Sequence, residues 1–132
     1  MTSILIVDDD EILRAVAGEM LRQSDHCVVE AEDGLAALRL IDAVPIDLVI
    51  LDMLMPNMDG FEVISEIRRR YPTVRILAIS GGGLVDGKSL LTTARVLGAD
   101  GCLSKPLTRA VLEAAIAEVM GQTSDSLRSV QR

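Results

Sequence analysis

Residues 3–16 read SILIVDDDEILRAV, and this stretch decides the fold class. It opens with the short apolar run Ser3–Val7, whose length and β-branched residues are typical of a buried parallel strand. Three aspartates follow, and Asp10 stands as the N-cap of a predicted helix over Glu11–Gln23. The apolar residues of that helix fall on one stripe, which we expect to face the core: Ile12, Leu13, Val16, Met20 and Leu21. A strand joined to an amphipathic helix in this way predicts an α/β fold.

Four more strand and helix pairs follow along the chain. The runs Asp47–Leu51 and Val74–Ile79 are strongly apolar, whereas Cys27–Ala31, which alternates with Glu30, and the very short Gly101–Ser104 are weaker strands. The remaining helices are predicted over Gly34–Ala43, Gly60–Arg70, Lys88–Leu97 and Arg109–Met120. Because the first, third and fourth strands are the most apolar, they should be central. We therefore predict a (βα)5 chain that forms a flavodoxin-like three-layer α/β/α sandwich with parallel sheet order 2-1-3-4-5.

Length and charge describe one acidic domain. The chain has 132 residues, of which 49% are hydrophobic, and a net charge of −7. We expect a domain over residues 1–120 and a loose, polar C-terminal tail over residues 121–132. The negative charge argues against direct binding of nucleic acid or of an anionic membrane, because phosphates are bound by clustered Lys and Arg.

The sequence favours a cytoplasmic protein. No apolar run approaches the ~18 residues that span a bilayer. The N-terminus turns acidic at once and lacks the basic region of a signal peptide. Cys27 and Cys102 have no metal-ligand spacing, so we expect both to be buried thiols in a reducing compartment.

The aspartates that follow two of the strands indicate a metal site. Asp8, Asp9 and Asp10 follow the first strand and Asp52 follows the third, and these strands should be neighbours about 4.8 Å apart. Ligands of such sheets bind beyond the carboxyl ends of the strands at this point. Carboxylates 4 Å apart repel each other by about 4 kcal/mol at an effective dielectric of 20, and a hard cation such as Mg²⁺ relieves that repulsion. For Asp10, helix capping is an equally good explanation.

A hydroxyl and a cation should lie at the same edge. Ser80 ends the fourth strand and is followed by Gly81–Gly83, and Lys105 ends the fifth strand before Pro106. Lys105 should point toward the acidic cluster, although a lysine at a strand end can also be a solvated charge. A carboxylate nucleophile, a neutralising cation and a hydrogen-bond donor are the groups that phosphoryl transfer needs.

Taken together, these motifs resemble the receiver domain of two-component response regulators. The matching pieces are VDDD at 7–10, LDMLMPNMDG at 51–60, SGGG at 80–83 and SKP at 104–106. The resemblance covers about residues 3–120 and implies a stand-alone receiver that is not an enzyme but forms an aspartyl phosphate. It also implies that output passes to a downstream target protein, or onward along a phosphorelay.

The resemblance assigns a role to each matching residue. Asp52 would accept the phosphoryl group from a sensor histidine kinase or a histidine phosphotransfer protein. Asp9 and Asp52 would ligate Mg²⁺ directly together with the backbone carbonyl of Leu54, and Asp8 would act mainly through water or a hydrogen bond. Lys105 would pair first with Asp52 and then with the phosphoryl oxygens.

The expected switch involves two further positions. Ser80 would bind the phosphoryl group and draw the following loop inward, which would alter the face built by the fourth helix, fifth strand and fifth helix. Receivers often carry an aromatic residue three positions before the lysine, and Cys102 stands there in this chain. Either the coupling is weak here, or another residue carries it, and Cys102 is then a packing residue.

Other functions are open to such a sequence. A degenerate receiver that serves only as an interaction scaffold would keep the fold, and the chain could be the N-terminal part of a longer regulator. A flavodoxin-like FMN binder is disfavoured because Asp8–Asp10 would repel the FMN phosphate. A haloacid-dehalogenase-type phosphatase usually has a second Asp where this chain has Leu54.

Overall fold

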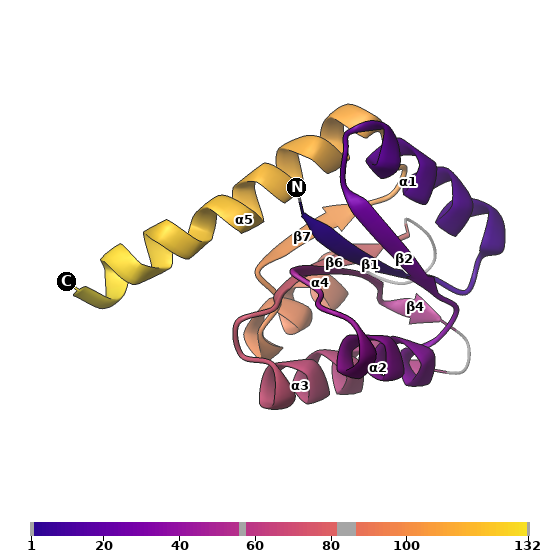
Figure 1. Cartoon of the computed structure of the whole chain (residues 1–132). Helices are drawn as coiled ribbons and strands as arrows, with labels where there is room; N and C mark the ends of the chain where they lie inside the picture. The colour runs from indigo at the N-terminus through magenta and orange to yellow at the C-terminus, as the bar shows by residue number, and fades with distance from the viewer. Residues whose placement is uncertain (1, 56–57, 82–86, 132) are drawn as a thin grey trace.

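The computed structural model describes the backbone of residues 2–55, 58–81 and 87–131, and the side chains of 2–55, 60–81 and 92–121. Within this part of the chain, five parallel strands form a sheet in the order β2-β1-β3-β6-β7 (Figure 1). These are β1 (Ser3–Val7), β2 (Cys27–Ala31), β3 (Leu48–Asp52), β6 (Arg75–Ser80) and β7 (Gly101–Ser104). Counted along the chain, they have the predicted order 2-1-3-4-5, and all residues of the central β3 are buried.

Helices cover both faces of the sheet, as expected for a three-layer sandwich (Figure 1). They are α1 (Glu11–Gln23), α2 (Gly34–Ala43), α3 (Gly60–Arg70), α4 (Gly87–Leu97) and α5 (Arg109–Gln131). Side chains of α1 and α5 pack with Ile4, Ile6 and Ile50 on one face. Side chains of α2, α3 and α4 pack with Leu5 and Val49 on the other. Alternate residues of each strand therefore serve opposite core layers, which explains the continuous apolar runs.

A small hairpin follows β3 that the sequence analysis does not predict. Strands β4 (Leu54–Met55) and β5 (Met58–Asp59) pair antiparallel, with Leu54 opposite Asp59. The hairpin lies between β3 and α3, so it forms part of the carboxyl edge of the sheet. Each strand has only two residues, which is too short for a periodic pattern to reveal.

Helix α1 packs differently from the prediction. Its buried residues are Ala17, Gly18 and Leu21, whereas Ile12 is 74%, Val16 52% and Leu13 42% exposed. The prediction that the whole stripe faces the core is therefore wrong. The small residues Ala17 and Gly18 let the helix lie close to the sheet, and the larger residues nearer its N-terminus are left partly uncovered.

Helix α5 is longer than predicted. It continues through Gly121 to Gln131, so the prediction of a loose tail over residues 121–132 is wrong in that respect. A glycine inside a helix costs only about 1 kcal/mol, and no proline follows it in the sequence, so an existing helix can propagate through this stretch. Among the described side chains, Leu112, Ile116 and Val119 in the first half of the helix pack in the core, and the backbone of the second half extends away from the body (Figure 1).

The two cysteines are less buried than expected. Cys27 is exposed at the start of the outermost strand β2, and Cys102 is half-buried in β7. The expectation of two buried thiols is thus wrong for Cys27, because the edge position of β2 leaves its first residue open to solvent. Within the described residues, every helix is too short or too polar to cross a lipid bilayer.

Candidate functional site

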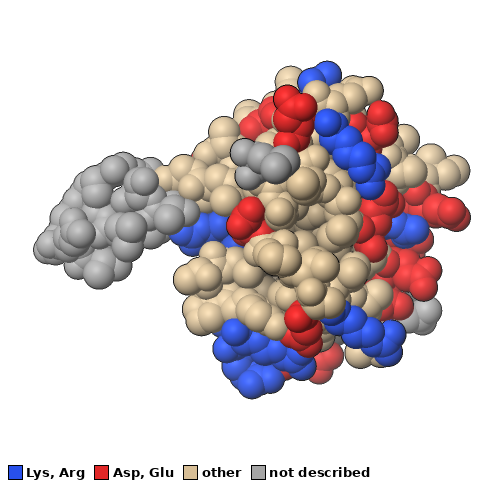
Figure 2. All heavy atoms as spheres, in the orientation of Figure 1, with Lys and Arg blue, Asp and Glu red and all other residues tan. Residues whose placement is uncertain are grey.

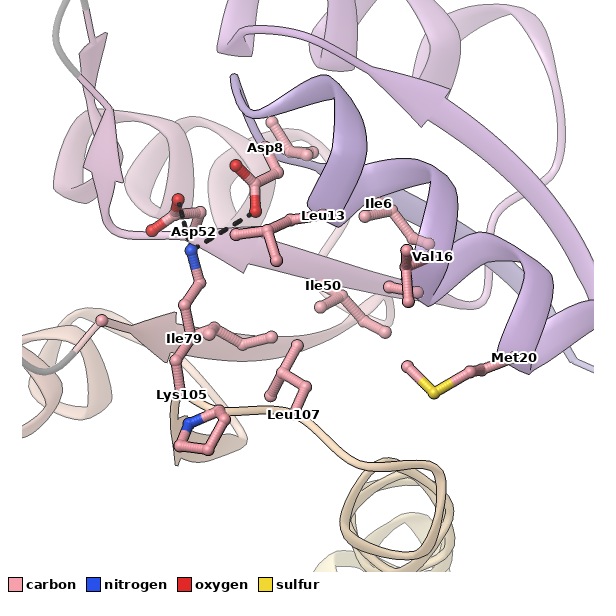
Figure 3. A pocket seen from close by; sticks show the side chains of 14 residues that line it. Ile6, Asp8, Leu13, Val16, Met20, Ile50, Asp52, Ile79, Lys105 and Leu107 are labelled. Atoms are coloured by element: carbon pink, nitrogen blue, oxygen red, sulfur yellow. Dashed lines mark hydrogen bonds and ion pairs between the residues drawn. The ribbon is translucent and has the colours of Figure 1, made fainter.

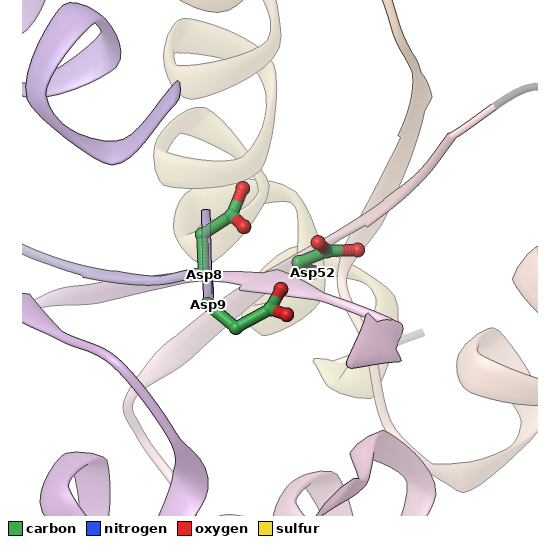
Figure 4. Close-up of side chains that lie close together, drawn as sticks. All are labelled: Asp8, Asp9 and Asp52. Carbon is green, nitrogen blue, oxygen red and sulfur yellow. The ribbon is translucent and has the colours of Figure 1, made fainter. Parts of the chain in front are cut away.

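Three predicted carboxylates meet at the carboxyl edge of the sheet. Val7 pairs with Leu51, so the residues that follow them, Asp8 and Asp52, leave adjacent strands side by side. One carboxylate oxygen from each of Asp8, Asp9 and Asp52 lies within 4.8 Å of the other two (Figure 4). Asp8 and Asp52 are only 7% and 4% exposed, whereas Asp9 faces solvent. The cluster is therefore half enclosed by protein and open on one side.

Asp10 has a different role from its neighbours. Its Oδ1 accepts hydrogen bonds from the backbone N–H groups of Ile12 (3.0 Å) and Leu13 (3.2 Å), which caps helix α1. Its own backbone N–H donates to Asp8 Oδ1 at 2.9 Å. Helix capping therefore explains this third aspartate, and its N–H helps to orient the Asp8 carboxylate.

Lys105 brings the expected positive charge to the cluster. Its Nζ lies 3.2 Å from Asp52 Oδ2 and 3.5 Å from Asp8 Oδ2 (Figure 3). The residue follows β7, and its backbone N–H donates to the carbonyl of Ser80 at 2.8 Å, which ties this loop to the end of β6. The fifth strand therefore delivers the ammonium group to the carboxylates that follow the first and third strands.

The residues present fit a hard divalent cation. The three carboxylates carry three negative charges, and Lys105 offsets one of them. Oxygen ligands 2.0–2.1 Å from an octahedral Mg²⁺ would lie about 3–4 Å apart, so the observed cluster needs only small side-chain movements to form such a shell. The backbone N–H of Leu54 donates to Asp52 Oδ1 at 3.0 Å, which places Leu54 beside the cluster. The predicted role of the Leu54 carbonyl as a ligand stays a prediction.

Burial dominates the electrostatics of Asp52. Desolvation raises its pKa above the usual value, and the nearby negative charge of Asp8 adds to the rise. The hydrogen bond from Leu54 and the charge of Lys105 lower the pKa without cancelling the increase. For Lys105, burial alone would lower the pKa, but the attraction of Asp52 and Asp8 outweighs burial and raises it. The lysine therefore remains charged at neutral pH.

The two expected switch residues lie in the neighbouring strands β6 and β7. Ser80 is 1% exposed at the end of β6, and its Oγ donates to the carbonyl of the next residue, Gly81, at 3.2 Å. The rest of the glycine run lies outside the described residues. Cys102 pairs with Ala78 across the sheet and packs against the core layer beneath α2, α3 and α4. Its position agrees with a packing role.

A groove beside the cluster is the main feature that sequence reasoning missed. It has a volume of about 480 Å³, and Asp8, Asp52 and Lys105 line one end of it. The rest of its wall is largely apolar and comes from α1, the sheet and the segment before α5, with Leu13, Val16, Met20, Ile50, Ile79 and Leu107 (Figure 3). The sequence signal that could have revealed the groove is the apolar stripe of α1, which is wider than the part of the helix that the core covers.

The charge distribution distinguishes the two ends of the strands. Asp and Glu side chains gather on the side of the molecule toward which β1 and β3 run (Figure 2). Lys and Arg side chains gather below, where α3 ends with Arg68, Arg69 and Arg70. The acidic side attracts cations and is the side on which the cluster of Asp8, Asp9 and Asp52 lies.

A comparison with protein families matches residues 4–117 to the model of the response regulator receiver domain. The chain is a receiver domain of the response-regulator family. It is 38% identical over 122 residues to the two-component response regulator ORR41 of Oryza sativa, covering 89% of this chain and 94% of that protein. It is also 34% identical over 114 residues to the sensor histidine kinase RcsC of Salmonella typhimurium, covering 86% of this chain but only 12% of that much longer protein.

Solved structures agree with the family. The receiver superposes on a response regulator receiver domain protein from Clostridium thermocellum with a TM-score of 0.84 at 26% identity, over 94% of this chain and 98% of that one. The chemotaxis protein CheY4 of Vibrio cholerae gives 0.81 at 29% identity, over 90% and 98%. These neighbours confirm the flavodoxin-like fold and place the chain among the signalling domains of two-component systems.

Proposed function

We propose that this receiver accepts a phosphoryl group on Asp52 from a phosphohistidine of a partner, either a sensor histidine kinase or a histidine phosphotransfer protein. One observation carries the proposal, namely the convergence of Asp8, Asp9, Asp52 and Lys105 at the end of the sheet. Such crowding of charge disfavours the metal-free fold, which is understandable if the cluster serves phosphoryl transfer. The cytoplasm is the compartment that fits this chemistry.

The surroundings of Asp52 suit it to act as the nucleophile. The Leu54 N–H holds Oδ1 and Lys105 holds Oδ2, so the plane of the carboxylate is fixed by a donor on each oxygen. An Asp52 oxygen would form the new O–P bond while the P–N bond of the donor breaks and its electron pair returns to the imidazole nitrogen. Lys105 is placed to move from the carboxylate to the phosphoryl oxygens as their charge arrives beside it.

Magnesium is the cofactor that we infer for this step. Asp9, Asp52 and the Leu54 carbonyl would hold it directly, and Asp8 through water. When bound, it would supply positive charge that offsets the phosphoryl oxygens and the carboxylate. Lys105 offsets only one of the three negative charges of the cluster. The two that remain match the charge of a divalent ion.

The groove beside Asp52 supports a protein as the phosphodonor. Asp52 is nearly buried, so a donor must approach from the open carboxyl edge, where Leu13 and Val16 are 42% and 52% exposed. An apolar surface next to the donor histidine could cover these side chains during transfer. Contacts of this kind are typical of protein interfaces and are not needed by a small phosphodonor.

Output would follow from the new charge at Asp52. The Ser80 hydroxyl would exchange its bond to the Gly81 carbonyl for a phosphoryl oxygen, which would draw the next loop toward the site. The face formed by α4, β7 and α5 would then change its affinity for a downstream target protein. Cys102 has too little bulk to move as an aromatic side chain would, so the loop after Ser80 would carry most of the change.

Intact-protein mass spectrometry after treatment with phosphoramidate tests the proposal. The unaltered protein should gain one phosphoryl group in the presence of Mg²⁺ and much less in EDTA. Asp52→Asn should abolish the gain, while Asp10→Asn, which preserves a good helix cap outside the cluster, should retain it. Labelling of Asp52→Asn would move the acceptor elsewhere. A well-folded protein that is never labelled would favour the scaffold alternative.

A further inference from the structure

Arg14 makes a contact with the acidic segment that the proposed function does not use. It lies in α1, and its Nη1 donates to the backbone carbonyl oxygen of Asp8 at 2.7 Å. Its Nε donates to Glu30 Oε1 in β2 at 3.2 Å. The side chain is only 15% exposed, so the guanidinium is held between the two acceptors. Charge-assisted hydrogen bonds of this kind are stronger than neutral ones.

Both backbone groups of Asp8 are consequently tied to the same strand. Its N–H donates to the carbonyl of Ala31 at 3.2 Å, and its C=O is held through Arg14 by the adjacent residue Glu30. The peptide that joins Asp8 to Asp9 is planar, so fixing its carbonyl oxygen fixes the orientation of the whole unit. The directions in which both side chains leave the backbone therefore depend on the Glu30–Arg14 pair.

We propose that Arg14, held by Glu30, is a positioning residue that orients the Asp8–Asp9 peptide for binding of a divalent cation. The proposal rests on the proposed function, because it concerns the metal that the receiver would use. Outer partners that orient metal ligands commonly change metal affinity by roughly 10- to 100-fold when they are removed. Asp9 needs this support most, because it is exposed and lies at a bend between β1 and α1.

Arg22 provides a matched control within the same helix. Its Nη2 donates to the other oxygen of Glu30, Oε2, at 3.1 Å and reaches the carbonyl of Val28 at 3.5 Å. Val28 pairs with Ile4, far back along the strand from the aspartates. Arg14 and Arg22 thus share a partner and both join α1 to β2, but it is Arg14 that binds the Asp8 carbonyl.

The sign of the effect separates positioning from simple electrostatics. A nearby positive charge repels a bound cation. Its removal should therefore tighten cation binding, in Arg14→Ala and Arg22→Ala alike. A loss of the link between α1 and β2 should lower thermal stability without a selective effect on the cation. Loss of orientation at the Asp8–Asp9 peptide should instead weaken cation binding, and only in Arg14→Ala.

Isothermal titration with Mg²⁺ tests this on the full chain, with far-UV circular dichroism as a check of folding. We expect binding about tenfold weaker in Arg14→Ala and changed by less than about twofold in Arg22→Ala. Arg14→Lys, which can still donate to the Asp8 carbonyl but cannot span to Glu30, should recover part of the loss. Glu30→Gln keeps a weaker acceptor for Arg14 and should give a loss of about threefold.

The possible outcomes distinguish this inference from the proposed function. If the unaltered protein binds Mg²⁺ and Arg14→Ala binds it equally well or more tightly, Arg14 does not position the site, while the proposed function stands. If the unaltered protein shows no binding, both proposals fail. If Arg14→Ala does not fold, Arg14→Lys and Glu30→Gln decide, because unchanged affinity in both overturns the role of Arg14.

Discussion

At the scale of single residues, Asp52 shows how a reactive group is maintained against the stability of the fold. Its carboxylate is 4% exposed and close to those of Asp8 and Asp9, and burial raises its pKa even with Lys105 at 3.2 Å. Ionisation of Asp52 is therefore less favourable in the folded protein than in the unfolded chain. In its ionised form, Asp52 therefore destabilises the metal-free fold.

We expect Asp52→Asn to stabilise the metal-free receiver at neutral pH, by on the order of 1 kcal/mol or about 4 °C in Tm. Because the folded-state pKa is raised, the folded protein binds more protons than the unfolded chain between the unperturbed pKa of 3.8 and the raised pKa. The stabilisation by a protonated Asp52 is complete below that window and is lost as pH rises through it. The advantage of the asparagine should therefore grow with pH.

Thermal melts in EDTA between pH 4 and pH 8 measure this dependence. Asp10→Asn serves as the control, since its side chain caps α1 and lies outside the acidic cluster. A constant difference between Asp52→Asn and the unaltered protein across the whole pH range would contradict the electrostatic explanation.

At the scale of elements, helix α1 shows what periodicity can and cannot predict. The apolar stripe correctly predicts a helix over Glu11–Gln23 with Asp10 as its cap. It does not reveal which part of the stripe the sheet covers, because that depends on how Ala17 and Gly18 let the helix approach. The exposed Val16 and the buried Leu21 belong to the same stripe and differ only in that three-dimensional contact.

Two isosteric substitutions test this division of the apolar residues. Val16→Thr, in the open groove, should change the free energy of unfolding by no more than about 0.5 kcal/mol, as is usual for exposed positions. Val49→Thr, at 0% exposure in β3, places a hydroxyl in an apolar layer and should cost about 1–3 kcal/mol. Urea unfolding of both variants provides the measurement. Equal losses would mean that the groove is closed in solution.

A second comparison concerns two glycines, Gly121 within α5 and Gly101 in β7, where the strand lies against α5. A Cβ at Gly121 meets nothing within 4 Å, so Gly121→Ala should stabilise the helix by about 0.5–1 kcal/mol and increase its far-UV dichroism. A Cβ at Gly101 would lie 2.6 Å from Val119 Cγ1 and 3.2 Å from Leu77 Cδ1. Gly101→Ala should therefore destabilise the protein by about 1–3 kcal/mol. If Gly121→Ala lowers helicity, the helix does not run through this position in solution.

At the scale of the whole molecule, the sheet order and the site were predictable for the same reason. The strength of the apolar runs identifies the central strands, and the residue after each strand then falls at one edge, which brings Asp8 and Asp52 together. Contacts between distant side chains were not predictable in this way. In the sequence, Glu30 is indistinguishable from an ordinary charged residue on an edge strand. Its bond to Arg14 depends on where α1 packs, which no local sequence pattern specifies.

Binding of Mg²⁺ should therefore act on the stability of the entire fold. The carboxylates that would bind it follow β1 and β3, and unfolding separates them, so the ion should bind the folded state selectively. At a Mg²⁺ concentration about 100 times Kd, the gain would be about 2.7 kcal/mol, and Tm should rise with the logarithm of concentration. Calorimetric melts at constant ionic strength measure the rise, which EDTA should reverse. Asp9→Asn should reduce the rise, because Asp9 belongs to the acidic cluster. Asp10→Asn should preserve the rise, because Asp10 caps α1 and lies outside the cluster. An equal rise in both variants would place the ion elsewhere on the acidic side of the molecule.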